Sequence, residues 1–243
     1  MPQRKSWSDI SCQAKEPILY DVPVSNNGGR IRCIIYKKKL EGKIDIRSPT
    51  EIGGLRSEEF AALNPYRKMP VLVLPSGEAF PESQVIESYL LDKYRDQEPS
   101  LIPETSELRA RAALIARIHD LYIAPTQGCM YKKMDNQEER TRQISQISDQ
   151  LDMLERYCIG PYMCGDTLSY ADSAVLPTLV FCNFILPRYF GWSTIFKDRP
   201  QLEKWWQKVS QDPDLSRVMK EIEGGLEAWV ESDRWTKLGI IHN

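Results

Sequence analysis

The chain has 243 residues, of which 42% are hydrophobic and 27% charged, and its formal net charge is −2. This composition is typical of a soluble globular protein with one large or two small domains. An excess of positive charge, which a nucleic-acid interface requires, is lacking. No window approaches the roughly eighteen apolar residues of a membrane span. Neither nucleic acid nor a membrane is therefore expected as a partner.

Residues 1–16 are predicted to form a flexible N-terminal tail. The stretch MPQRKSWSDISCQAKEP contains no apolar core of the kind that a secretory signal needs. A cytoplasmic location is expected. An alternative is that the tail is the remnant of a transit segment, which would direct the protein to an organelle such as a plastid.

The six cysteines are scattered without a CxxC pair, and there are only two histidines. A zinc site or a catalytic Cys–His pair would need a tighter grouping of these residues. The pattern predicts buried thiols in a reducing compartment and no metal.

Residues 17–94 alternate the signals of strands and helices. The predicted elements are a strand at 17–24, helices at 30–40 and 58–63, a strand at 43–46, a hairpin of 69–74 with 78–80, and a helix at 84–94. In chain order they read β-α-β-α-β-β-α, which predicts a small α/β domain.

Residues 95–106 are polar and contain two prolines, so they are predicted to be a linker. Beyond the linker, 107–243 is predicted to be an all-helical domain. Its expected helices lie at 107–122, 136–157, 170–184, 200–210 and 215–230, and the third is apolar enough to be buried.

The stretch KMPVL suggests an irregular strand start. Pro70 cannot donate to a sheet ladder, and a cis bond between Met69 and Pro70 would turn the chain tightly. The backbone of Met69 would then offer unpaired polar groups, which can bind an extended peptide as an added strand.

The pair Glu82-Ser83 stands where the predicted helix at 84–94 begins. Free N–H groups at a helix start favour an anion, the hydroxyl of Ser83 adds a donor, and Glu82 adds an acceptor for an ammonium group. The pair fits the zwitterionic end of a short peptide. The alternative is a plain helix cap.

The stretches KMPVL and PESQVIESYL together resemble the thioredoxin-like half of the glutathione transferases. The family has a cis-proline before its third strand and a Glu/Gln-Ser pair at its third helix. The stretch GDTLSYADSAVLP resembles the family's buried helix, with Ser169 as N-cap and Asp172 as its reciprocal partner. Ser173 departs from the family, which usually has an apolar residue there. The resemblance covers roughly 17–230 and implies a thioredoxin-like glutathione-binding domain followed by a helical domain.

The resemblance also implies a catalytic residue after the first strand. In SNNGGRIR, Ser25 lies five positions before Arg30, as in the family's plant-type serine classes and zeta class. It would stabilise the glutathione thiolate, with Asn26 and Asn27 as further candidate donors. The alternative is that Ser25 is only a turn or capping residue.

Further roles carry over singly from the family. Lys68 and Met69 match residues that stand just before the cis-proline and contact glutathione. Arg56 matches a basic residue that reaches the glycine carboxylate of glutathione. The alternative for Arg56 is a solvated surface charge. Tyr66 matches an aromatic residue that projects into the partner subunit of a homodimer. Candidate walls for a second substrate are Tyr122, Met130 and Tyr131, together with either Trp229 or Trp235.

The expected function is conjugation of glutathione to an electrophilic small molecule, as in detoxification, with glutathione as co-substrate and no metal. Two alternatives remain open. One is a glutathione-dependent isomerase, dehalogenase or peroxidase that uses the same site. The other is a non-catalytic binding protein of the same fold.

Overall fold

The computed structural model describes residues 15–240, so the predicted tail at 1–16 lies almost wholly outside the described part of the chain. The chain divides into two compact units, the first ending at Pro99 and the second beginning at Ser100. This boundary falls inside the segment 95–106 that the sequence predicts as a linker.

The first unit is a four-stranded mixed sheet with helices. Its elements are β1 (Ile18–Tyr20), α1 (Asn26–Lys37), β2 (Asp45–Arg47), the 3-10 helix η2 (Pro49–Ile52), α2 (Glu58–Leu63), β3 (Val71–Val73), β4 (Ala79–Pro81) and α3 (Ser83–Lys93). The strand order is β2-β1-β3-β4, with β1 parallel to β2 and antiparallel to β3, and β3 antiparallel to β4. The predicted βαβαββα order is confirmed.

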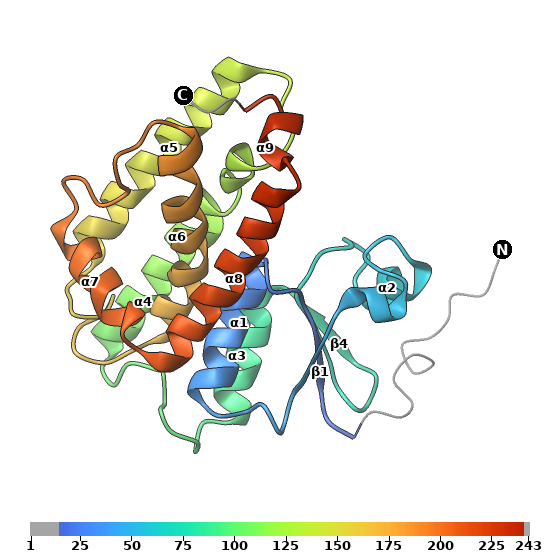
Figure 1. The fold of residues 1–243 in the computed structure, drawn as a ribbon. Coiled ribbons are helices and arrows are strands. Elements are labelled where there is room, and N and C mark those ends of the chain that lie inside the picture. The colour runs from blue at the N-terminus through green and yellow to red at the C-terminus, as the bar shows by residue number, and fades with distance from the viewer. Residues whose placement is uncertain (1–14, 241–243) are drawn as a thin grey trace. The chain divides into compact units, whose positions relative to one another are not determined.

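Both faces of this sheet are covered by helices. On one face, Phe60 and Leu63 of α2 pack with Tyr20 and Val71 in one buried cluster. Since successive strand residues point to opposite faces, Leu19 points to the other side. There α1 and α3 lie side by side in Figure 1 and contact each other.

The start of α1 differs from its prediction. The sequence places the helix at 30–40 after a turn, whereas the helix begins at Asn26, and β1 ends at Tyr20 rather than continuing to 24. The cause is the side chain of Ser25, which caps the helix. Its oxygen accepts a hydrogen bond from the Gly28 N–H at 3.0 Å, so the residues read as a turn form the first helical turn.

The second unit is helical. Its elements are α4 (Ser106–Ile118), the π-helical turn η3 (His119–Ile123), the 3-10 helix η4 (Gln127–Met130), α5 (Gln137–Tyr157), α6 (Tyr170–Tyr189), α7 (Pro200–Ser210), α8 (Pro213–Glu231) and α9 (Arg234–Lys237). The predicted α/β unit followed by an all-helical unit is confirmed. Helix α9 was not predicted.

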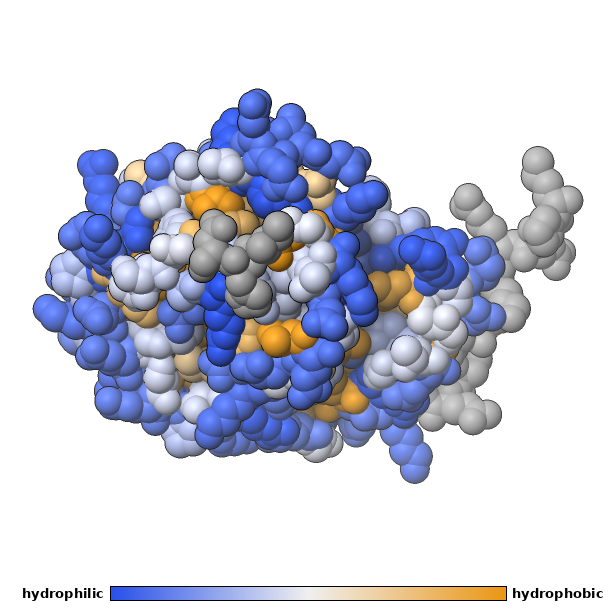
Figure 2. Space-filling model, turned by 45° about the horizontal axis from the view of Figure 1, so that its top comes forward, coloured by the Kyte–Doolittle hydropathy of each residue, from blue (hydrophilic) through white to orange (hydrophobic). Residues whose placement is uncertain are grey.

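Helix α6 forms the centre of the second unit and contacts α4 and α8 (Figure 1). It is long and apolar enough to cross a membrane by length and composition, but 83% of its apolar window is buried inside the protein. It is therefore the core helix of this unit. The face of the molecule in Figure 2 is mostly hydrophilic, with only small hydrophobic areas.

The predicted cap of α6 is present. The Asp172 carboxylate accepts hydrogen bonds at 2.8 Å from the main-chain N–H groups of Ser169 and Met163 and from Nε1 of Trp205. Asp172 is fully buried. Burial raises the pKa of Asp172 and these hydrogen bonds lower it. One carboxylate thus links the start of α6 to the loop before it and to α7.

Candidate functional site

Three segments leave the sheet at the same edge. The register pairs Tyr20, the last residue of β1, with Val71, the first of β3, and pairs Val71 with Pro81, the last of β4. Because β3 runs antiparallel to both neighbours, the end of β1, the start of β3 and the end of β4 meet at one edge. The segments that continue from this edge carry five predicted site residues: Ser25, Met69, Pro70, Glu82 and Ser83.

Ser25 is the N-cap of α1 and is buried, with 8% of its surface exposed. The capping alternative is therefore realised, and the capping bond leaves the one hydroxyl hydrogen for the Asp21 carboxylate or for a ligand. A hydroxyl has one donor hydrogen and two acceptor sites, and the bond from Gly28 uses only an acceptor site. Asn26 and Asn27 form the first turn of α1 and are half-buried.

A buried ion pair lies beneath this helix start. Nε of Arg32 is 3.0 Å from Oδ2 of Asp21, and both side chains are almost fully buried. The Arg32 guanidinium also donates to the main-chain oxygens of Pro23 at 2.6 Å and of Ser25 at 3.3 Å. Arg32 therefore holds the whole loop that presents Ser25.

Two opposing effects act on the pKa of the Asp21 carboxyl. Burial raises the pKa of its carboxyl, while the Arg32 guanidinium and, more weakly, the Ser25 hydroxyl lower it. The carboxylate lies so close to the backbone of α1 that a Cβ on Gly28 would be 1.8 Å from Oδ1 of Asp21. Only glycine fits at this position.

The Met69–Pro70 bond is cis, as the sequence predicts. The loop before it is organised by Asn64, which is buried. Nδ2 of Asn64 donates to the Lys68 oxygen at 2.7 Å, and its Oδ1 accepts from the Tyr66 N–H at 3.0 Å. Met69 is half-buried and packs on the apolar cluster beside α2. Its position is therefore fixed by this packing and by the Asn64 hydrogen bond to the preceding residue, Lys68.

Glu82 has an unusual backbone conformation, with φ at 73°. A non-glycine residue in this region carries strain that typically occurs at functional positions. Its exposed side chain makes no capping hydrogen bond to α3, so Glu82 is not a plain side-chain cap. Ser83 opens the helix and is buried at 9% exposure.

The two predicted basic contacts, Arg56 and Lys68, are both exposed. Arg56 follows β2, whose last residue pairs with Tyr20 and so ends at the same edge of the sheet. Arg67 donates to the main-chain oxygens of Arg56 and Ser57 and pairs with Glu58 at 2.9 Å. Arg67 thereby ties the segment of Arg56 to the loop before Pro70.

Comparisons with known proteins agree with this architecture. The family model described as glutathione S-transferase, N-terminal domain, matches residues 19–99, and the one described as glutathione S-transferase, C-terminal domain, matches residues 137–207. Together they span more than half of the chain. Glutathione S-transferase F10 of Arabidopsis thaliana is 30% identical over 174 residues, which cover 65% of this chain and 76% of that relative. The chain belongs to the glutathione transferase family.

Other glutathione transferase relatives and a related isomerase are also similar to the chain. Maleylacetoacetate isomerase of Mus musculus is 28% identical over 170 residues, covering 68% of this chain and 77% of that protein. The crystal structure of glutathione transferase F7 from Populus trichocarpa superposes with a TM-score of 0.71 at 20% identity, covering 85% of this chain and 99% of that one. That likeness shows the shared fold.

Sequence reasoning within this family placed two second-substrate walls incorrectly. Met130 and Trp235 are buried inside the helical unit, where Nε1 of Trp235 donates to the Met130 oxygen at 2.9 Å. They pack as core residues and line no open surface. Tyr131 and Trp229 are half-buried and in ring contact with each other, and Tyr122 is exposed.

Five cysteines of this transferase-family chain lie in the described part, and all are free and buried. Burial raises the thiol pKa of Cys129 and Cys182 to about 12, and of Cys158 and Cys164 to about 11. Such thiols are poor nucleophiles at neutral pH. Within residues 15–240, no group of three or more His, Cys, Asp or Glu side chains is arranged to hold a metal ion.

Sequence reasoning missed Asp21, Arg32 and Asn64, which position the predicted site residues. The sequence gives a partial indication that Arg32 is buried, because Arg32 lies next to Ile31 and close to Ile34 and Ile35 in a predicted helix. Its partner Asp21 lies before the helix, and nothing in the spacing marks the two as a pair.

Proposed function

We propose that this glutathione transferase family member binds glutathione at the edge of its sheet and conjugates it to an electrophilic small molecule. The observation that carries the proposal is the convergence of Ser25, Met69 and Ser83 at one edge, fixed by the strand register. In this arrangement the γ-glutamyl end binds at Glu82 and Ser83, and the cysteine pairs with the backbone of Met69.

The size of the edge suits a tripeptide. Segments from β1, β3 and β4 span two strand spacings, which is about 10 Å. An extended tripeptide also reaches about 10 Å. With the γ-glutamyl end beside β4, the cysteine reaches β3 and its thiol can extend toward the segment after β1, where Ser25 caps α1. Arg56 and Lys68 supply positive charge for the glycine carboxylate.

In this proposal Ser25 stabilises the thiolate rather than acting as a base. A free thiol has a pKa of about 8.5, and lowering it by two units requires about 2.7 kcal/mol of preference for the anion. The Ser25 hydroxyl donates to the sulfur, and the positive end of α1 adds to this. Asn26 or Asn27 is a candidate second donor. The thiolate then attacks the electrophile.

A second candidate function is glutathione-dependent isomerisation on the same site, which the similarity to maleylacetoacetate isomerase favours. Dehalogenation and peroxide reduction would use the same thiolate. A non-catalytic binding protein of this fold would bind glutathione without ionising it. We further propose a cytoplasmic homodimer.

Calorimetry tests the placement of glutathione. The double variant Glu82→Ala, Ser83→Ala removes the two groups at the start of α3 and should bind glutathione several-fold more weakly or worse. The matched control is Glu78→Ala with Ser88→Ala, since both residues are exposed and Ser88 lies further along α3. The control should bind as the parent does. Unchanged affinity in a folded Glu82→Ala, Ser83→Ala variant would rule out this placement.

A further inference from the structure

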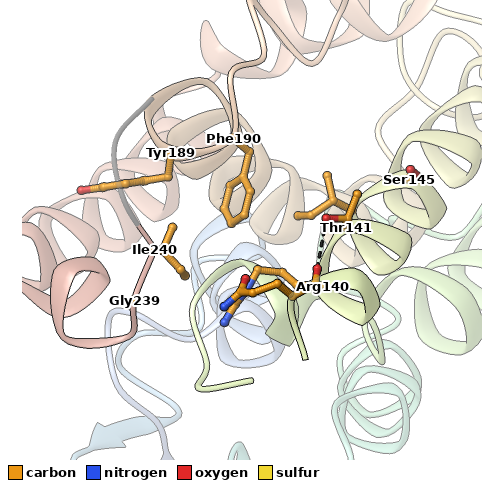
Figure 3. A pocket seen from close by; sticks show the side chains of 9 residues that line it. Arg140, Thr141, Ser145, Tyr189, Phe190, Gly239 and Ile240 are labelled. Atoms are coloured by element: carbon orange, nitrogen blue, oxygen red, sulfur yellow. Dashed lines mark hydrogen bonds between the residues drawn. The ribbon is translucent and has the colours of Figure 1, made fainter. Parts of the chain in front are cut away.

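Three buried side-chain atoms within residues 15–240 have no hydrogen-bond partner: Oδ1 of Asp21, Oε1 of Gln127 and Nε of Arg140. Gln127 and Arg140 are buried in the helical unit. Figure 3 shows Arg140 beside a pocket of that unit, where its guanidinium donates to the main-chain oxygens of Cys129 and Lys132. Asp21 differs from both, because it directly follows β1 at the sheet edge that carries the candidate site.

The unpaired oxygen of Asp21 and the Ser25 hydroxyl lie against the same residue, Gly28. The Ser25 oxygen accepts the Gly28 N–H at 3.0 Å, and a Cβ on Gly28 would be 1.8 Å from Oδ1 of Asp21. The Ser25 hydroxyl is near enough to lower the pKa of the Asp21 carboxyl, although Oδ1 completes no hydrogen bond within the described residues. The two oxygens are therefore neighbours, and a small adjustment of either side chain lets the hydroxyl donate to Oδ1.

The charges around Asp21 leave Oδ1 available as a proton acceptor. Arg32 is the charged group that acts on this carboxyl, and its Nε lies 3.0 Å from the other oxygen, Oδ2. On the neighbouring strand β2, the main-chain oxygen of Arg47 accepts the Asp21 N–H, while the Arg47 guanidinium pairs with Asp45. Burial raises the pKa of Asp21. A carboxylate with a raised pKa is a better base at neutral pH than an ordinary one.

We propose that the Asp21 carboxylate takes up the proton that the glutathione thiol loses, with the Ser25 hydroxyl as the link between them. This inference rests on the placement of glutathione proposed above. The S–H bond breaks and its proton passes to the Ser25 oxygen, while the Ser25 hydroxyl hydrogen passes to Oδ1 of Asp21. The products are a thiolate and a neutral Asp21 carboxyl, so the total charge is unchanged and no further reactant is needed.

This transfer gives every polar group at the start of α1 a partner. The Ser25 oxygen accepts from the Gly28 N–H and from the protonated Asp21, which fills its two acceptor sites, and its one hydrogen is donated to sulfur. Oδ1 gains the partner that it lacks, and Oδ2 keeps Arg32. The nearby thiolate raises the pKa of Asp21 further and so holds the proton there. Asp21 is thus a positioning residue, since it acts on sulfur through Ser25.

The number of protons released on binding tests this inference. Calorimetry in phosphate and in Tris, which differ in ionisation enthalpy, gives the protons that the complex releases to the buffer. S-methylglutathione is the matched ligand, because it keeps the peptide groups and has no thiol proton. The ultraviolet absorbance of the complex gives the amount of thiolate. At neutral pH the parent should form thiolate with glutathione and release no more protons than it does with S-methylglutathione.

Asp21→Asn should release about one proton for each thiolate formed, because an amide takes up no proton and the thiol must then lose its proton to water. Glu87→Gln is the matched control, since Glu87 is also a buried carboxylate that pairs with an arginine of α1, Arg30, at 2.8 Å. The control should show the proton count of the parent. A role of Asp21 in folding alone would leave the proton count per thiolate unchanged.

Three results would overturn this inference and leave the proposed function standing. These are a parent that releases about one proton per thiolate, an Asp21→Asn variant that forms thiolate without releasing a proton, and equal release by Asp21→Asn and Glu87→Gln. A parent that binds glutathione without forming thiolate would contradict the proposed function as well. If Asp21→Asn does not fold or does not bind glutathione, the proton count of the parent decides the question.

Discussion

Gly28 occupies a place in the first turn of α1 where no side chain fits. The carboxylate of Asp21 lies directly against its Cα, held there by Arg32. The same turn presents Ser25, whose oxygen accepts the Gly28 N–H. The cap, the ion pair and the glycine therefore form one unit, and disturbing any of them moves the residue proposed to contact sulfur.

Gly28→Ala should lower the free energy of unfolding by about 2–3 kcal/mol, because the new Cβ would overlap the Asp21 carboxylate and force the turn to move. Glutathione affinity or turnover should fall with it. Denaturant titration gives the stability. Gly224→Ala is the matched control: Gly224 is an exposed helical residue of α8 with nothing within 4 Å of an added Cβ. This change should be neutral or stabilise by up to about 1 kcal/mol. Equal stability of Gly28→Ala and the parent would contradict the account.

Some residues of the candidate site could be predicted from the sequence, and others could not. Pro70, Glu82 and Ser83 stand out because each has a local cause, either a missing donor or a helix start. Asp21 and Arg32 do not stand out, because two charges become a buried pair only once the fold brings loop and helix together. The positions of Asp21 and Arg32 in the sequence do not predict that their side chains pair.

At the scale of elements, the ends of helices depend on buried side chains. Helix α6 begins where Asp172 collects hydrogen bonds from Ser169, Met163 and Trp205. These partners come from the helix start, the preceding loop and α7. The cap therefore fixes the central helix of the unit against its surroundings.

Asp172→Asn should destabilise the helical unit by about 3 kcal/mol, because an amide places N–H donors against the N–H donors that the carboxylate now satisfies. Urea unfolding followed by circular dichroism measures this loss. Asp149→Asn makes the same change at an exposed position of α5 and should stay within about 0.5 kcal/mol of the parent. A loss in Asp172→Asn no larger than that of the control would show that the cap is dispensable.

The spacing of apolar residues along the sequence predicted most of the helices and strands and the order in which they occur. It predicted less well where each of these elements begins and ends. Helix α7 begins and ends where predicted, since Pro200 starts it. Helix α6 continues five residues beyond 184 to Tyr189, through Pro187, because the burial of Ile185, Leu186 and Tyr189 outweighs the local cost of proline. Helix α9 is only four residues long and has too short a pattern to detect.

At the scale of the whole molecule, the loop before Pro70 presents a large exposed ring. Tyr66 is 75% exposed, while its N–H is bound to Oδ1 of the buried Asn64. A fixed loop that holds an aromatic ring in water is suited to a partner surface. We therefore propose that Tyr66 contacts the second subunit of a homodimer, where two-fold symmetry repeats the contact.

Light scattering tests the dimer. The parent should have about twice the 28.1 kDa mass of one chain, and Tyr66→Ala should dissociate at a higher protein concentration, because one substitution removes two anchors. A parent that is monomeric at micromolar concentration would exclude the dimer. An unchanged dissociation in Tyr66→Ala would exclude only the role of this residue.

Ser25 and the start of α1 are proposed to stabilise the thiolate of bound glutathione. The most direct test follows the ultraviolet absorbance of the bound thiolate as pH is raised, in the parent and in Ser25→Ala. In the parent, the bound thiol should ionise below the free-thiol pKa of about 8.5. In Ser25→Ala the midpoint should move up while glutathione affinity stays nearly unchanged, since the hydroxyl meets sulfur and not the peptide ends. A parent whose bound thiol ionises at the same pH as free glutathione, or a Ser25→Ala variant with the parent's midpoint, would contradict the account.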